Sequence, residues 1–145
     1  MTLPERSDKQ NENDKRVRRK DNKRVGAQGE LLVRQYLERD GWHVLTANFR
    51  CPQGEIDLIA EQPAMLENEQ PTLVFVEVKT RRGTTHGLPL QAVDGRKQEK
   101  LRLCALAYLG ERDAAGAEPA CRFDVAEVFI DGSGLARIVM HTGIF

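Results

Sequence analysis

The sequence predicts an α/β fold in which helices flank a mixed β-sheet, with elements in the order α-β-β-β-α-β-β. Two segments carry apolar residues at helical spacings of three and four, and five shorter runs are rich in residues that favour strands. The turn sequence "DGSG" joins the last two runs and is typical of a β-hairpin. A length of 145 residues suits one domain with one core.

The composition narrows the function classes. The formal net charge is zero, with 22 basic and 22 acidic residues, so bulk charge does not indicate a nucleic-acid binder. We expect no membrane span and no secretory signal, because apolar runs of the necessary length are absent from the sequence. The three cysteines are widely spaced and form no CxxC pair, which makes a disulfide framework or a zinc site unexpected and favours a reducing cytoplasm.

Residues 1–24 carry few apolar side chains, so we expect a disordered basic tail before a folded domain at 25–145. Within it, residues 15–24 hold seven basic residues and one acid. Two interpretations stay open: a solvated tail, which the segment alone favours, and an arm that contacts phosphate backbones.

The first helix is expected over residues 26–40, with Gly41 ending it. Its apolar face consists of Leu32, Val33, Tyr36 and Leu37. A weakly alternating strand follows at 43–50, then a turn at 51–54 and a second strand at 55–60.

The third strand, which has the strongest strand pattern, is expected at 73–80, between loops at 61–72 and 81–90. Asp94 is a suitable N-cap for a helix to about residue 109, with Leu101, Ala105 and Tyr108 on its apolar face. After a loop at 112–120, strands at 121–130 and 135–141 complete a mixed sheet covered by helices.

Charged residues interrupt two of these apolar strands. Glu77 and Lys79 share a face with Leu73 and Phe75, and Asp57 interrupts the second strand. If the two strands pair, Asp57 lies beside Glu77, and two buried carboxylates without a cation repel each other. Mg²⁺ removes that repulsion and takes carboxylate oxygens as ligands. Lys79 then stabilises negative charge on a phosphate or holds a water.

A structural interpretation of the same three residues stays open. Asp57 and Lys79 can form a cross-strand salt bridge, with Glu77 directed to solvent. The ExK spacing at the end of a very apolar strand favours the metal site instead.

Further candidates lie outside these two strands. Glu30 lies at the edge of the first helix's apolar face, where the helix dipole alone also favours an acid. Lys97 opposes that dipole in the first turn of the second helix, which indicates either a snorkelling side chain or a phosphate or active-site contact. Arg81 and Arg82 follow Lys79 at the carboxyl end of a strand, where open sheets bind ligands; a solvated turn is the alternative.

The motifs "GAQGE" (26–30), "GEIDLIA" (54–60), "FVEVKTRR" (75–82) and "RFDV" (122–125) resemble those of the YraN-like family of small bacterial proteins. The resemblance covers residues 26–145. That family in turn resembles restriction-endonuclease-like proteins and, most closely, archaeal Holliday junction resolvases.

The resemblance implies a restriction-endonuclease-like fold and a PD-(D/E)xK nuclease site. Asp57 and Glu77 would bind Mg²⁺ or Mn²⁺, Glu30 would support the metal, and Lys79 would position the attacking water. Gln98 resembles a helix glutamine of some relatives. The proline that often precedes the aspartate is absent, since Ile56 stands there.

These observations predict a Mg²⁺-dependent endonuclease that hydrolyses DNA phosphodiester bonds, at branched or otherwise structured DNA. The resemblance to resolvases also implies a homodimer. Two alternatives stay open: a catalytically inactive nucleic-acid-binding or scaffold module with the same fold, and a charge network with a protein partner.

Overall fold

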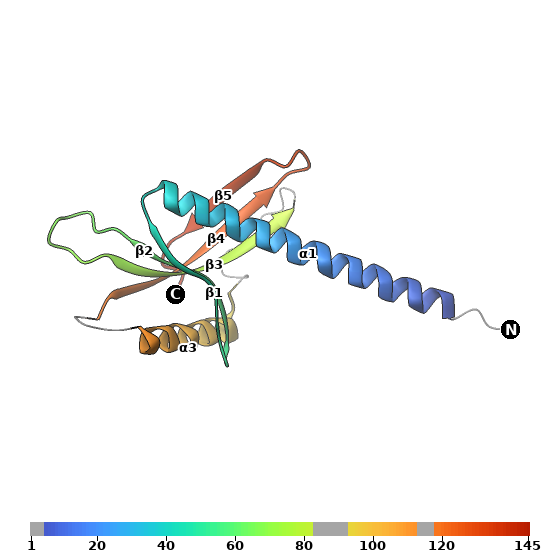
Figure 1. Cartoon of the computed structure of the whole chain (residues 1–145), viewed down its shortest axis with the longest axis horizontal. Coiled ribbons are helices and arrows are strands. Elements are labelled where there is room, and N and C mark those ends of the chain that lie inside the picture. The colour runs from blue at the N-terminus through green and yellow to red at the C-terminus, as the bar shows by residue number, and fades with distance from the viewer. Residues whose placement is uncertain (1–4, 83–92, 113–117) are drawn as a thin grey trace.

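The computed structural model describes residues 5–82, 93–112 and 118–145, and its elements follow the predicted order α-β-β-β-α-β-β (Figure 1). The predicted loops at 81–90 and 112–120 therefore lie largely outside the described residues, as do residues 1–4. No described helix has the length and apolar character to cross a membrane. The elements are α1 (Glu5–Arg39), β1 (His43–Cys51), β2 (Gly54–Gln62), β3 (Thr72–Arg82), α3 (Gly95–Glu111), β4 (Ala120–Ile130) and β5 (Ala136–His141).

The five strands form a single mixed sheet in the order β1-β2-β3-β4-β5. β1, β2 and β3 are an antiparallel meander, and β4 and β5 form an antiparallel hairpin. β4 runs parallel to β3. A parallel neighbour needs a long crossover, and α3 provides it. Asp94 begins α3 as predicted, accepting a hydrogen bond from the Lys97 backbone N–H.

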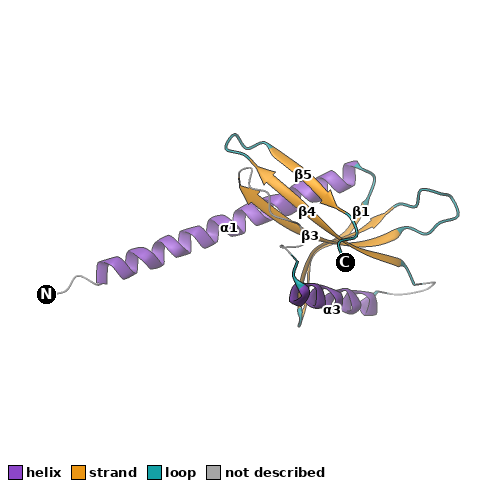
Figure 2. Ribbon diagram, turned by 180° about the vertical axis from the view of Figure 1, so that it is seen from behind, coloured by secondary structure: helices purple, strands orange, loops and turns teal. Residues whose placement is uncertain are grey.

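The two helices cover opposite faces of the sheet (Figure 2). Alternate residues of β3 divide between the two layers: Val74 and Val76 pack with Val33 of α1, whereas Leu73 and Phe75 pack with Leu101 of α3. Apolar residues on both faces of β3 fit its central place in the sheet. The predicted apolar faces of both helices are confirmed except at Tyr36. This residue is 44% exposed because it lies at the edge of the buried face of α1, next to the buried Leu37.

The expected disorder of residues 1–24 is corrected for the part that the structure describes. Residues 5–24 are helical and continue into the packed part of α1, giving one helix of 35 residues. Apolar content predicts burial, and residues 8–24 are indeed exposed, but it does not predict helicity. Lys, Arg, Glu and Gln are good helix formers, and the segment has no proline or glycine between residues 5 and 25. It therefore extends, towards the N-terminus, a helix that is already nucleated by the packing of Val33 and Leu37.

The cysteines also depart from expectation. Cys51, at the end of β1, and the fully buried Cys104 of α3 form a disulfide, with their Cα atoms 5.8 Å apart. Residues 53 positions apart in sequence gave no sign of this pairing. Cys121 is free and exposed. The disulfide joins the β1–β2 turn to α3, and both of these border the site described next.

Candidate functional site

β2 and β3 separate at Asp57. Their pairing runs from Gln62 opposite Thr72 to Leu58 opposite Val76, and no backbone pairing follows beyond that point. In its place, the Val78 backbone N–H donates to Asp57 Oδ2 at 2.8 Å. The Asp57 side chain thus substitutes for a strand partner, and an opening forms along the freed edge of β3.

The separation coincides with an unusual backbone at Asn48, which lies in β1 between the pairs Ala47–Leu58 and Phe49–Ile56. Asn48 has φ 53°, a left-handed conformation that asparagine tolerates better than most residues. Ala47 packs in the α1 layer, but Phe49 packs in the α3 layer. Since residues two apart in a regular strand share a face, the hairpin twists through the sheet plane at Asn48.

β2 twists at the matching position. Leu58 belongs to the α1 layer, whereas Ile56 and Ile59 belong to the α3 layer. The strict alternation of a regular strand therefore does not hold between Ile56 and Leu58. The twist directs Asp57 towards the open edge of β3 instead of into either apolar layer.

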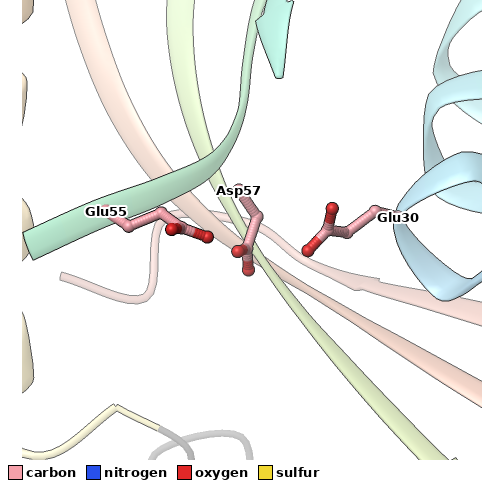
Figure 3. A group of neighbouring side chains, drawn as sticks. All are labelled: Glu30, Glu55 and Asp57. Carbon is pink, nitrogen blue, oxygen red and sulfur yellow. The ribbon is translucent and has the colours of Figure 1, made fainter. Parts of the chain in front are cut away.

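Three carboxylates converge at this edge (Figure 3). Glu30 comes from α1 and Glu55 and Asp57 from β2, and one carboxylate oxygen from each lies within 4.8 Å of the others. Asp57 lies between the two glutamates in the view of Figure 3. Glu55 also accepts from Arg50 Nε at 3.1 Å, a pair in which the arginine is largely exposed.

Glu30 reaches the site because α1 packs very closely on β3. A Cβ atom at Gly29 would lie 1.9 Å from Thr80 Oγ1, so no larger residue fits there without displacing Thr80. Glu30 is the next residue along the helix, and the nearby Asn48 side chain favours the charged form of its carboxylate. Gly29, the second glycine of "GAQGE", therefore sets the distance between the helix and the acidic site.

Two of these acids, Asp57 and Glu30, have raised pKa values in the absence of a cation. Burial, followed by the neighbouring negative charge of Glu77, raises the pKa of Asp57 to about 7. Burial, followed by the charge of Asp57, raises the pKa of Glu30. A divalent cation offsets both causes, and the donors are all carboxylate oxygens, the ligand type that Mg²⁺ and Mn²⁺ prefer. The residues present therefore fit such an ion.

Glu77 lies beside Asp57, and its carboxylate is engaged from another direction. Lys97 Nζ lies 2.5 Å from Glu77 Oε1, and the Glu77 side chain is only 11% exposed. Glu55, Asp57, Glu77 and Lys97 line one side of a cavity of about 270 Å³ under α3. Lys97 therefore contacts Glu77 beside the acidic cluster. Among the described residues no ion pair joins Asp57 to Lys79, the salt bridge considered from the sequence.

Lys79 is exposed and lines a second, larger cavity of about 580 Å³. Asp57 and Glu77 line this cavity too, together with Glu30 from α1 and Arg82 from the end of β3. Among the described residues, neither Lys79 nor Arg82 forms an ion pair. Both cations are therefore free to meet an anion beside the acidic cluster.

Two predicted site residues, Gln98 and Arg81, make contacts outside the acidic cluster. Gln98 Nε2 donates to the Val93 carbonyl oxygen at 3.2 Å, so its amide secures the start of α3. Arg81 Nε donates to Glu127 Oε2 at 2.9 Å, and His141 contacts the other oxygen of the same buried carboxylate. Neither residue lines the two cavities, so the predicted phosphate contact of Arg81 is not what its geometry favours.

Two site residues were missed at the level of sequence. Glu55 lies two positions before Asp57 in "GEIDLIA", and this spacing was the available signal, because alternate strand residues share a side. Asn48 gave no signal, since its backbone conformation depends on the tertiary twist of the hairpin.

We expect Asn48→Gly and Asn48→Val to affect stability very differently. Glycine keeps the left-handed backbone and loses only the polar interaction of the Asn48 side chain with Glu30, so the free energy of unfolding should fall by about 1 kcal/mol or less. Valine cannot adopt this conformation without strain, and the loss should be about 2–3 kcal/mol. Urea denaturation of both proteins measures the difference, and equal losses would mean that the backbone of Asn48 does not hold the twist.

Comparison with known proteins identifies a family of similar sequences. The model of a family described as "Uncharacterised protein family UPF0102" matches residues 29–128, which include the acidic cluster and Lys79. A UPF0102 protein of Moorella thermoacetica is 44% identical over 109 residues, covering 75% of this chain and 83% of the relative. A UPF0102 protein of Beutenbergia cavernae is 40% identical over 120 residues, covering 83% and 94%. One of Pelotomaculum thermopropionicum is 38% identical over 119 residues, covering 82% and 92%.

Proposed function

The chain belongs to the uncharacterised protein family UPF0102, and we propose that it is a metal-dependent endonuclease that hydrolyses DNA phosphodiester bonds. The observation that carries this proposal is the convergence of Glu30, Glu55 and Asp57 beside the exposed amine of Lys79. Acids that gather at one point, among them Glu30 and Asp57 with raised pKa values, are suited to a divalent cation. Lys79, which forms no ion pair among the described residues, lies next to these acids and is suited to bind a phosphate group that such a cation would attract.

The carboxylates would hold the ion. Asp57 would be the central ligand, with Glu30 and Glu55 on either side of it. Glu77 lies next to Asp57 and is paired with Lys97. When bound, Mg²⁺ or Mn²⁺ supplies Lewis-acid stabilisation of negative charge on a phosphate. Lys97 holds the Glu77 carboxylate in place through their ion pair.

Two basic residues of the larger cavity, Arg82 and Lys79, would contact the substrate. Arg82, exposed at the end of β3, is suited to bind a phosphate oxygen and orient the scissile bond. Lys79 is placed to hold the attacking water by its ammonium group and to offset the charge that develops on phosphorus. Its exposure leaves the amine accessible to a large substrate.

Nuclease assays on plasmid, single-stranded, flap and four-way-junction DNA test this proposal. We expect cutting with Mg²⁺ or Mn²⁺ and none in EDTA, and the Asp57→Asn protein should not cut under any of these conditions. A preference for four-way junctions would imply paired cuts and hence a homodimer, which light scattering measures. If the protein binds these DNAs but never cuts them with either metal, the inactive binding module is the correct interpretation.

A further inference from the structure

The part of α1 that extends beyond the sheet begins at the larger cavity. Asn22, Val25 and Gly26 line that cavity, and the helix continues from there away from the folded body (Figure 1). Residues 8–24 are exposed along their whole length. We call residues 15–24 the basic arm. Its position makes it a continuation of the candidate site instead of a separate tail.

The charge of this helix is distributed along its axis. The basic arm holds seven basic residues and one acid, and it is the part nearest the cavity, whereas Asp8, Glu12 and Asp14 lie further out. Within the arm, like charges stand four residues apart at Lys15–Arg19, Arg16–Lys20, Arg19–Lys23 and Lys20–Arg24. Each such pair destabilises a helix by a few tenths of a kcal/mol. A polyanion lying along the arm would remove this repulsion and stabilise the helix.

The composition of the arm excludes two other occupants. Val17 is the one apolar side chain within residues 8–24, and a single valine makes neither a coiled-coil seam nor a membrane-inserting face. The ligand must therefore be recognised by its negative charge. Ten helical residues span about 15 Å, which matches the rise of four to five base pairs of duplex.

The helical period divides the arm into two faces. At about 100° per residue, Lys15, Arg18 and Arg19 fall on the side of Asn22, which lines the cavity; we call them the near-face trio. Arg16, Lys20 and Arg24 fall on the opposite side and form the far-face trio. The two trios carry equal charge and differ only in direction.

We propose that the near-face trio of α1 binds the phosphate backbone of double-stranded nucleic acid over four to five base pairs next to the candidate site. The inference rests on the proposed function for the identity of the polyanion, because phosphodiester chemistry at the cavity requires the same polymer to pass over Asn22. The stiffness of a helix favours duplex, whose phosphates keep a regular spacing, over a flexible single strand.

Two charge-matched triple variants test the proposal in the full chain. Lys15→Ala, Arg18→Ala and Arg19→Ala together remove the near-face trio, and Arg16→Ala, Lys20→Ala and Arg24→Ala remove the far-face trio. Fluorescence anisotropy in EDTA, with a 20-base-pair DNA duplex, the same duplex as RNA, the single strand and heparin, gives affinities over a range of salt concentrations. Circular dichroism at 222 nm follows the helix content of the same mixtures.

We expect the near-face variant to lose at least about tenfold in duplex affinity at 50 mM salt, with a salt slope reduced by about three, while the far-face variant loses much less. Helix content of the parent should rise on adding duplex. Whether DNA or RNA duplex binds more tightly identifies the polymer. Equal losses from the two variants, equal affinity for heparin and duplex, or tighter binding of the single strand would each overturn the proposal.

The outcome separates this inference from the proposed function, because every measurement is made in EDTA, where no metal-dependent cutting occurs. A protein that cuts DNA but shows equal losses in the two variants would disprove only the directed arm. A protein that binds duplex through the near-face trio but never cuts it would disprove only the nuclease.

Discussion

Replacing Lys79 by methionine should abolish cutting while leaving the fold intact. The Lys79→Met protein should melt within a few degrees of the parent, bind DNA, and cut at least about a hundredfold more slowly in Mg²⁺, the scale that is typical when one charge-stabilising group is removed from an active site. The structural reason is that Lys79 is exposed and lines the larger cavity, so its charge contributes to the site without supporting the core. Methionine keeps most of the stem's volume and removes only the ammonium group.

A variant with the same loss of charge elsewhere provides the control. Arg34→Met removes a positive charge from the exposed surface of α1, where Arg34 pairs with Glu38, and it should cut like the parent. Single-turnover cleavage rates and thermal melting of the three proteins settle the comparison. If Lys79→Met cuts as fast as the parent, the mechanism is wrong, and if it unfolds, Lys79 has a structural role.

Replacing Asp57 by asparagine should stabilise the metal-free protein while destroying its response to metal. The pKa of Asp57 is raised from 3.8 to about 7 in the folded protein, so between about pH 4 and pH 7 the folded state binds more protons than the unfolded state. The free energy of unfolding therefore falls as the pH rises through this range. Asparagine does not titrate and escapes that fall, and its side-chain oxygen still accepts from the Val78 N–H.

In EDTA at pH 8 we expect Asp57→Asn to melt about 5 °C or more above the parent, and at pH 4 the two should nearly coincide. Adding Mg²⁺ or Mn²⁺ at pH 8 should raise the melting temperature of the parent and leave that of Asp57→Asn almost unchanged. Glu99→Gln, which removes one exposed acid from α3, should behave like the parent throughout. A parent whose melting temperature in EDTA rises from pH 5 to pH 8 would contradict a pKa of Asp57 raised by burial and by the charge of Glu77.

The order of the elements and the location of the acids followed from local patterns. Apolar periodicity distinguishes helix from strand, and the double-sided apolar pattern of β3 marked it as central before its neighbours were known. Asp57 and Glu77 came together because antiparallel neighbours in a meander bring corresponding positions side by side. These features depend on residues close in sequence, and such patterns are visible in one chain.

The rest depends on tertiary geometry. The ion pair between Lys97 and Glu77 needs the placement of α3 over β3, which a helical pattern alone does not specify. The outer turns of α1 lacked apolar residues, and that absence reports exposure without distinguishing an exposed helix from a disordered chain. The twist at Asn48 likewise arises from packing its two flanking segments on different layers. No single-sequence signal encodes these relations.

The exposed outer turns of α1 have a consequence for how such a protein can diverge. Residues 8–24 contribute nothing to either apolar layer, and the UPF0102 match begins only at residue 29. Substitutions there escape the purifying pressure that packing imposes on Val33 or Leu37, because they leave the folded body's free energy unchanged. Substrate affinity can therefore be raised, lowered or redirected by drift in this one segment, with the acidic centre held constant. Natural selection can therefore change a helix that protrudes from the sheet without changing the stability of the folded body.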